Sequence, residues 1–472
     1  MRYFSTIILI FIFVACSEKD DTVTCISGLI QNPTHDHIFV SEGGQRTDTL
    51  TIQDDGSFHS RIDVNKPKLM VFEHPPDYQT FYVTPGDSLS FRLNTFDFDG
   101  SLVFSGDSSE ENNFLMDMYL MNEANNDLIL SYYKIPADVF SDKTDSIKAN
   151  RIKKLEELHK KHHFSEDFMD IAKKSINYEY YDIRERYAFL LKKYFPKKAN
   201  SMDDGFFEYR KSVDFNDAEL ISHFGYLRFL DDHLKNLSIK NCSEADKQSK
   251  KTCFDLTSFN NIHRRLKLVD SIFNNEKLKK KFLGRFFEQE MVHISTKEQL
   301  KKATKLLDNV NIGKDKKQKL ESFFNFHKNF IVGKKIDQLT LKNHDKDTVK
   351  VGHFTDKPHT AIHVWSLSMP MMNKNRFKLI KRMRKKHDDI NFIGINVEPD
   401  NYNLWQQNVT QYGLTRQHEL QTVSSPNYEL FNYYLNRFTL IDENGKVIAT
   451  EVLNTDNDIK EFIVDNTQKK PE

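Results

Sequence analysis

The stretch that decides the fold reads His363-Val-Trp-Ser-Leu-Ser-Met-Pro-Met-Met-Asn373. It continues an apolar run, 360–364, and precedes an amphipathic, basic segment, 376–387. A short apolar run indicates a buried strand, and apolar residues recurring every three to four positions indicate a helix. Because proline is tolerated in the first turn of a helix, where its missing N–H costs nothing, Pro370 marks the start of that helix. The stretch therefore predicts a buried strand that leads directly into a helix.

Residues 364–372 resemble the redox motif of the thioredoxin-like family, whose periplasmic branch reads roughly Phe-Trp-Ala-x-Trp-Cys-x-Pro-Cys. The two sequences align without a gap, with Met369 and Met372 where the family has its cysteines. Disulfide exchange needs a thiolate that attacks a disulfide and a second thiol that resolves the mixed disulfide. A thioether has no ionisable proton and forms no mixed disulfide. The resemblance implies a thioredoxin-like fold, and the two methionines imply a redox-inactive domain.

The pattern after residue 336 alternates between strands and helices in the order of the same family. The segment Phe438-Thr-Leu-Ile-Asp-Glu-Asn-Gly-Lys-Val447 resembles the family hairpin Phe-Leu-Ile-Asp-x-x-Gly-Lys. We expect strands at 349–353, 360–365, 390–397, 418–423, 437–442 and 447–453, and helices at 374–387, 403–412, 428–435 and 459–465.

The family also places a cis-proline just before the hairpin strand, facing the dithiol, and here Asn436 stands at that position. A cis bond before a residue other than proline costs about 2.5–4 kcal/mol, so we expect a trans bond. The family site is thus degenerate at Met369, Pro370, Met371, Met372 and Asn436, and we assign it no catalytic residue.

The altered site suggests a binding or scaffolding module. Methionine side chains are flexible and polarizable, so surfaces rich in them accommodate irregular partners. We expect an exposed binding surface that contains Trp365, Met369, Pro370, Met371 and Met372. Simple packing of these methionines around the tryptophan is an equally good reading.

Two other functions stay open as alternatives. Copper handling is suggested by Met369, Met371 and Met372, because thioethers suit Cu(I), with His363 nearby in sequence. However, copper-binding members of the family use cysteines and a histidine that are missing at the matching positions, so we predict no metal site there.

The other alternative is a thiol-disulfide oxidoreductase that uses cysteines outside the family motif. The chain offers Cys25, Cys242 and Cys253. The last two flank a short polar loop, and in an oxidising compartment a disulfide between them would persist. We predict a structural disulfide Cys242–Cys253, which in the chain-entropy picture contributes about 3 kcal/mol, and an unpaired Cys25.

The N-terminus has the features of a lipoprotein signal peptide. Arg2 precedes the apolar run 7–15, which is shorter than the roughly 20 residues of a membrane span. Phe13-Val-Ala-Cys16 resembles the lipobox of bacterial lipoproteins, except that Phe13 replaces an aliphatic residue. We therefore expect a signal peptide at 1–15 and lipidation of Cys16.

Residues 16–23 are expected to form a tether. The acidic and lysine-containing segment 17–21 resembles the signal that exports some lipoproteins to the cell surface. A generic solvated tether would look similar. We predict a protein anchored to the outer membrane of the bacterial cell envelope through lipidated Cys16, on the periplasmic face or the cell surface, with a possible protein partner there.

Composition excludes several other classes of function. Lys+Arg and Asp+Glu are equal at 68 each, so no net positive charge favours nucleic acid. The chain has no Gly-rich phosphate loop and no nucleophile motif. We therefore predict neither a cofactor nor a nucleic-acid partner.

The length of 472 residues suggests about three domains. Short alternating apolar runs separated by turn residues predict an antiparallel β-sandwich at 24–107. Its segments 82–89 and 104–107 resemble the small β domain that precedes thioredoxin-like modules in envelope lipoproteins. The helical period then predicts an α-helical domain at 108–330, and the thioredoxin-like domain occupies 331–472.

Two groups of histidines and one basic helix have ordinary explanations. His159, His162 and His163 lie on one helical face, but lysines stand between them and would repel a cation. His35 and His37 form a His-x-His in an expected turn. In the helix at 376–387 the apolar residues form a core face, so we expect most of its basic residues to face solvent.

Overall fold

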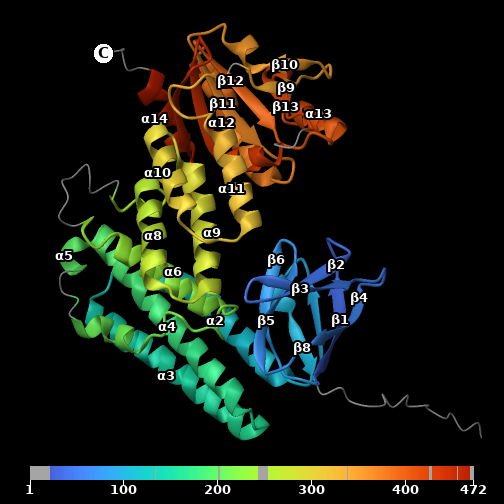
Figure 1. Cartoon of the computed structure of the whole chain (residues 1–472), viewed down its shortest axis with the longest axis vertical. Helices are drawn as coiled ribbons and strands as arrows, with labels where there is room; N and C mark the ends of the chain where they lie inside the picture. Colours follow the sequence, from blue (N-terminus) through green and yellow to red (C-terminus); the bar gives the residue numbers. More distant parts are fainter. Residues whose placement is uncertain are drawn as a thin grey trace, which may run out of the picture. The chain divides into compact units, whose positions relative to one another are not determined.

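The structure is a computed structural model that describes residues 22–132, 134–199, 202, 204–242, 253–336, 338–424, 428–453 and 455–467 (Figure 1). The expected signal peptide and Cys16 lie outside these ranges. The chain divides into two compact units, 1–237 and 238–472. Within the described ranges, no helix has the length and apolar character needed to cross a membrane.

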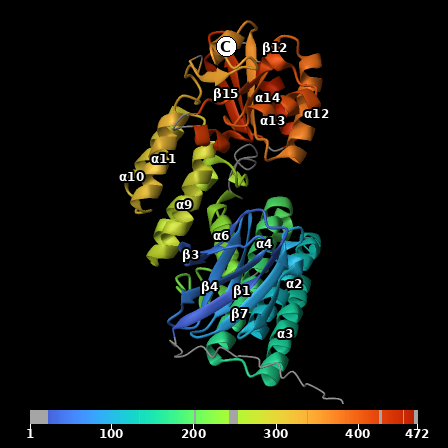
Figure 2. The same cartoon turned by 90° about the vertical axis from the view of Figure 1, so that its right-hand side faces the viewer.

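Unit 1 begins with two four-stranded sheets. The first has the order β4 (Ser57–Asp63), β1 (Val23–Gln31), β7 (Ser88–Asn94) and β8 (Val103–Gly106). The second has the order β3 (Gln45–Thr51), β2 (His37–Glu42), β5 (Lys68–His74) and β6 (Asp77–Val83). Figure 2 shows β4, β1 and β7 side by side.

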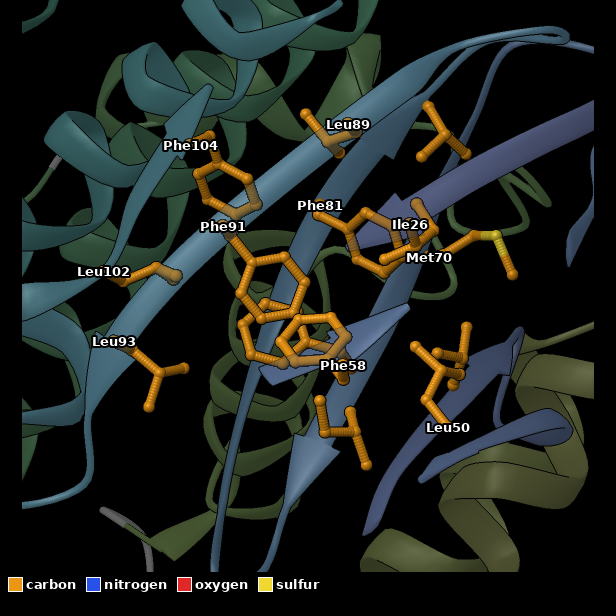
Figure 3. Close-up of a cluster of buried hydrophobic side chains, with 14 of the residues drawn as sticks. Ile26, Leu50, Phe58, Met70, Phe81, Leu89, Phe91, Leu93, Leu102 and Phe104 are labelled. Carbon is orange, nitrogen blue, oxygen red and sulfur yellow. The ribbon is translucent and has the colours of Figure 1, made fainter. Parts of the chain in front are cut away.

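The two sheets enclose one hydrophobic core, because alternate residues of each strand point inward (Figure 3). Phe91 of β7 lies at its centre, with ring centroids 4.9 Å from Phe58 and 4.4 Å from Phe72. The expectation of a purely antiparallel sandwich is wrong, because β1 pairs with β7 in parallel. Alternation of apolar residues shows that a strand is half-buried, but it does not encode the direction of its neighbour.

Helices follow the sandwich in unit 1. They are α1 (Phe98–Ser101), α2 (Ser109–Tyr132), α3 (Ala137–His162), α4 (Glu166–Tyr194), α5 (Pro196–Ala199), the 3-10 helix η1 (Asp204–Ser212) and α6 (Phe224–Ser238).

Two neighbouring asparagines attach α2 to both sheets. The amide of Asn112 exchanges hydrogen bonds with the backbone of Tyr82 at 2.7 and 2.8 Å. The amide of Asn113 does the same with Phe104 at 3.0 Å. Tyr82 and Phe104 lie in β6 and β8, which are edge strands. The two side chains therefore satisfy backbone groups that an edge strand would leave unpaired.

Unit 2 begins with helices as well. They are α8 (Phe259–Ile272), α9 (Glu276–His293), α10 (Lys297–Asp308) and α11 (Lys314–His327). His327, at the end of α11, is 2.6 Å from the hydroxyl of Tyr434 and 2.8 Å from the carbonyl oxygen of Ile294. The helices at 108–330 are therefore divided between the two units, whereas we expected one helical domain. The 3.6-residue period predicts each helix but not the element against which it packs.

A mixed seven-stranded sheet forms the rest of unit 2. Its order is β10 (Thr348–Lys350), β9 (Thr340–Lys342), β13 (Glu419–Gln421), β12 (Ile390–Asn396), β11 (His359–Trp365), β14 (Arg437–Asp442) and β15 (Val447–Val452). The pairs β11–β12 and β12–β13 are parallel, and β11–β14 and β14–β15 are antiparallel. The helices are α12 (Pro370–Lys386), α13 (Tyr402–Gln411) and α14 (Asp456–Thr467), with the 3-10 helices η3 (Val351–Phe354), η4 (Arg416–His418) and η5 (Tyr428–Tyr434).

Helices α12 and α14 cover one face of the central strands. Leu379 and Met383 of α12 and Phe462 of α14 share a core with Phe392 of β12 and Leu440 of β14. This β–α–β order with a closing hairpin and helix is the arrangement that the thioredoxin-like resemblance implied. Two expected strands are shorter than predicted: 349–353, because the chain turns into η3 at Val351, and 418–423, because η4 continues to His418. Helix α12 begins at Pro370, before the expected start at 374.

Candidate functional site

The expected site lies where β11 ends and α12 begins. Met369 is the N-cap residue of α12 and is 37% exposed. Pro370 follows at the first helical position and is exposed, and Met372 is half-buried. The side chain of Met371 lies outside the described part. Two of the expected surface residues, Met369 and Pro370, are therefore accessible from solvent.

Trp365 does not belong to that surface, which corrects our expectation. It is only 1% exposed and packs edge-to-face on Phe377 of α12, with ring centroids 5.1 Å apart. Trp405 and Val409 of α13 belong to the same buried cluster. Trp365 is the last residue of a strand that is buried on both faces. Its ring therefore packs in the core beneath the loop and is not accessible to a binding partner.

Hydrogen bonds to one carboxylate fix the loop between Trp365 and Met369. Glu398 accepts from the hydroxyl of Ser366 and, at 3.0 and 3.1 Å, from the backbone N–H of Leu367. Asn396 donates to the other side of this carboxylate at 2.6 Å. Asn373 of α12 donates to the carbonyl oxygen of Ser366 at 2.6 Å. The loop is therefore held from β12 and from α12.

Sequence reasoning missed Glu398 and Asn396, although a signal was present. Asn396 is the last residue of β12 and pairs in register with Trp365, the last residue of β11. Because parallel strands end at the same edge of a sheet, polar residues that follow one strand meet the loop that follows its neighbour.

Arg376 holds the loop in which the family has its cis-proline. Its guanidinium donates to the carbonyl oxygen of Leu435 at 2.8 Å and to the side chain of Asn436 at 3.4 Å. Arg376 is only 7% exposed, and burial lowers the pKa of its guanidinium. Among the described residues only the Pro75–Pro76 bond is cis, so the bond before Asn436 is trans.

Most basic residues of this helix face solvent, as expected, and the buried Arg376 is an exception to that pattern. Arg384 departs from it as well, since it donates to the carbonyl oxygen of Phe392 at 2.6 Å and lies 3.2 Å from the carboxylate of Glu419. The other basic residues of 376–386 are exposed or half-buried. The apolar pattern identifies the solvent-facing side of the helix, but it does not show which individual arginines are partly buried.

A buried histidine and a buried glutamate lie under α12. His363, Gly394 and Glu419 are in register on β11, β12 and β13, so their side chains share one face of the sheet. A Cβ on Gly394 would lie 2.0 Å from the Glu419 carboxylate, so only glycine leaves room for it. Burial raises the pKa of Glu419 to about 7, although Arg384 and the side chain of Trp365 oppose the shift.

His363 is fully buried, and its ring stacks on Phe438 at 5.9 Å. Burial lowers the pKa of His363 well below its usual value, and Arg384 and Arg376 add to the shift. The histidine is therefore neutral at physiological pH and lies in the interior, whereas Met369 is at the surface.

The described cysteines lie elsewhere. Cys242 and Cys253 form a disulfide at the start of unit 2, and its second cysteine receives hydrogen bonds on its carbonyl oxygen from Asn261 and Arg264 of α8, both at 3.4 Å. Cys25 is a free, half-buried thiol in β1 of unit 1. The loop at Met369 contains no thiol.

The histidine groups are not arranged as a metal site. His162 lies 3.7 Å from Glu110, and His163 forms the left-handed C-cap of α3. His35 and His37 have ring centroids 5.8 Å apart, edge to face. Among the described residues, no group of three or more His, Cys, Asp or Glu side chains is placed to hold a metal ion.

Comparison with known proteins gave matches only at the level of structure. No protein-family model matches the chain. No curated protein matches its sequence.

Part of the chain is similar to solved thioredoxin-like structures. A putative electron transfer protein from Aquifex aeolicus VF5 is 13% identical, with 28% of this chain and 94% of that chain covered and a TM-score of 0.24. A thiol-disulfide oxidoreductase from Bacteroides fragilis NCTC 9343 is 16% identical over 27% of this chain and 99% of its own, with a TM-score of 0.23. A thiol:disulfide interchange protein from a Bacteroides species is 13% identical over 30% and 94%, with a TM-score of 0.25.

Proposed function

We propose that this chain is a lipid-anchored protein of the bacterial cell envelope whose thioredoxin-like domain binds a protein or ligand and does not exchange disulfides. The observation that carries this proposal is the first turn of α12. Met369 and Met372 occupy it where dithiol chemistry needs two thiols, and a thioether supplies neither the attacking nor the resolving sulfur.

The loop before α12 also favours binding over redox chemistry. Glu398 and Asn373 fix its backbone, and Met369 and Pro370 stay accessible. A fixed loop that presents a flexible, polarizable side chain offers a surface for recognition at little cost in conformational entropy. Arg376 closes the neighbouring loop through Leu435, the loop that receives a substrate backbone in the resembled family.

The proposal is tested by an insulin disulfide reduction assay with dithiothreitol as the electron donor. The parent chain from Ser17 onward should precipitate insulin no faster than dithiothreitol alone. A parent that accelerates the reaction overturns the proposal and directs attention to Cys25, Cys242 and Cys253.

A pair of variants shows whether the missing thiols alone explain the inactivity. The double variant Met369→Cys, Met372→Cys is expected to gain activity, since the strand and helix that position the dithiol are present. The double variant Met369→Ser, Met372→Ser is the matched control, because it changes the same positions without adding thiols.

Membrane attachment has a separate test. Expressed in a Gram-negative host, the full chain should partition into the detergent phase of Triton X-114, and the variant Cys16→Ser into the aqueous phase. Equal partitioning of the two would contradict lipidation at Cys16.

A further inference from the structure

The helical part of unit 2 contains a cavity that the proposed function does not use. It has a volume of about 390 Å³ and lies between α8 and α10. Its lining includes Phe259, His263 and Lys267 of α8, Lys302 and Lys305 of α10, and Asn309 just beyond α10.

Helical spacing brings the basic side chains together. His263 and Lys267 are four residues apart on α8, and Lys302 and Lys305 are three apart on α10, so each pair shares a helix face. The charged residues of the lining are three lysines, and no carboxylate lines the cavity. Lys302 forms an exposed pair with Glu298 at 2.8 Å, which neutralises it only weakly. The concave wall therefore concentrates positive potential.

His263 is held in a fixed orientation beside these lysines. Its Nδ1 lies 2.5 Å from the carboxylate of Glu290, a fully buried residue of α9. The ring also stacks on Phe259, with centroids 5.4 Å apart. Because a carboxylate accepts hydrogen bonds, the pair is satisfied when Nδ1 carries the hydrogen, and the ring is then held against Glu290. This side chain loses little conformational freedom when a ligand binds.

We propose that this cavity binds a small organic molecule that carries two or more negative charges, such as phosphate or carboxylate groups. Lys267, Lys302 and Lys305 act as mobile point charges that follow the anionic groups. Asn309 adds a donor, and the ring of Phe259 gives an apolar wall for the organic part. The site is independent of the loop at Met369, so the two proposals can fail separately.

The test is isothermal titration calorimetry of the full chain, purified in a mild non-ionic detergent at low ionic strength. The probes are pyrophosphate and citrate, with glucose as a neutral control. We expect saturable binding of at least one anion and none of glucose. Tighter binding of pyrophosphate identifies a phosphorylated ligand, and tighter binding of citrate a polycarboxylate.

Variants locate the binding. Lys267→Ala and Lys305→Ala are each expected to weaken it roughly tenfold, because each removes a charge-assisted contact. Lys301→Ala is the matched control, since Lys301 is an exposed residue of α10 that does not line the cavity. The substituted lysines lie at the solvent-exposed side of the helices, and unchanged circular dichroism will show that the variants fold.

Two outcomes would overturn the proposal. One is the absence of measurable heat with both anions. The other is binding that the cavity variants weaken no more than Lys301→Ala does, which would mean diffuse attraction to a lysine-rich surface.

Discussion

The two units each bury a glutamate completely, and the two carboxylates behave in opposite ways. Glu185 of α4, in unit 1, and Glu419 of β13, in unit 2, both have no exposed surface. Burial alone would raise the pKa of Glu185, but hydrogen bonds from His233 and Arg210 outweigh it and lower the pKa to about 2. Burial raises the pKa of Glu419 to about 7.

The difference lies in the number of donors that each carboxylate finds. Glu185 accepts from Tyr209 at 3.0 Å, from Arg210 at 2.8 and 2.7 Å, from His233 at 2.9 Å and from Asn236 at 2.7 Å. Glu419 accepts from Arg384 at 3.2 Å, and the side chain of Trp365 also opposes the rise of its pKa. A buried charge whose hydrogen-bonding capacity is fully satisfied can stabilise the fold, whereas one with few hydrogen-bond partners lowers the stability. The comparison therefore separates a built polar core in unit 1 from a poorly satisfied one under α12.

The largest expected effect is that of Glu185→Ala. The substitution leaves Arg210 and His233 without their carboxylate, and breaking such a buried network costs about 3–5 kcal/mol of unfolding free energy. Urea unfolding at pH 7, with hydrogen exchange of α4 and α6 to localise the change to unit 1, measures it. Because the folded pKa of Glu185 lies below its ordinary value of 4.5, its contribution is present above pH 4.5 and is lost as the pH falls towards about 2.

An exposed ion pair provides the control for this experiment. Glu208 is 2.6 Å from Lys211, but the side chains are 63% and 78% exposed. Glu208→Ala should therefore change stability by less than about 1 kcal/mol. Equal effects of the two substitutions would mean that the donors around Glu185 do not stabilise unit 1.

The second expected effect is a pH dependence of Glu419→Gln. The pKa of Glu419 is raised from 4.5 to about 7, so its favourable contribution is complete below pH 4.5 and is lost as the pH rises through about 7. Glutamine does not titrate. The unfolding free energy of the parent minus that of the variant should thus fall by up to about 3 kcal/mol between pH 5 and pH 8.

Urea titrations of both proteins at several pH values measure this difference, and groups common to both cancel. The exposed Glu443 provides the matched substitution, because Glu443→Gln should leave the pH curve unchanged. A difference that does not vary with pH would show that Glu419 is ionised throughout and that Arg384 satisfies it.

The sequence contains the elements of unit 2 but not its buried charges. The presence of β11 and of α12 was predictable because the apolar run and Pro370 act locally, although the expected helix began at 374. The hairpin was predictable because Gly445 sits in a tight turn, at φ 72°. The fixing of the loop by Glu398 depends on the register between β11 and β12, which no local pattern encodes. The same holds for Glu419, which fits only because Gly394 stands opposite it on the neighbouring strand.

The position of the site in the fold was therefore predictable from the sequence, but only some of the residues that form it were. Met369 and Met372 were found because the resemblance aligns them with a motif. Trp365 was misplaced because a residue at the end of a strand points inward or outward according to the helix above it. Arg376 was misplaced because its partners, Leu435 and Asn436, come from a segment far along the chain.

The smallest expected effect is that of substituting Arg376. The number of hydrogen bonds that this buried side chain makes lies between those of Glu185 and Glu419. Its guanidinium donates to neutral acceptors, the Leu435 carbonyl oxygen and the Asn436 side chain. Burial of the charge opposes this stabilisation and lowers the pKa of Arg376. Arg376→Met keeps the apolar stem, so we expect a loss of about 1–2 kcal/mol of unfolding free energy and faster hydrogen exchange at β14. Lys378→Met, on the exposed side of α12, should change neither. If Arg376→Met is as stable as the parent, the hydrogen bonds to Leu435 and Asn436 only offset the desolvation of the charge. Arg376 would then resemble Glu419, a buried charged group under α12 that does not stabilise the fold.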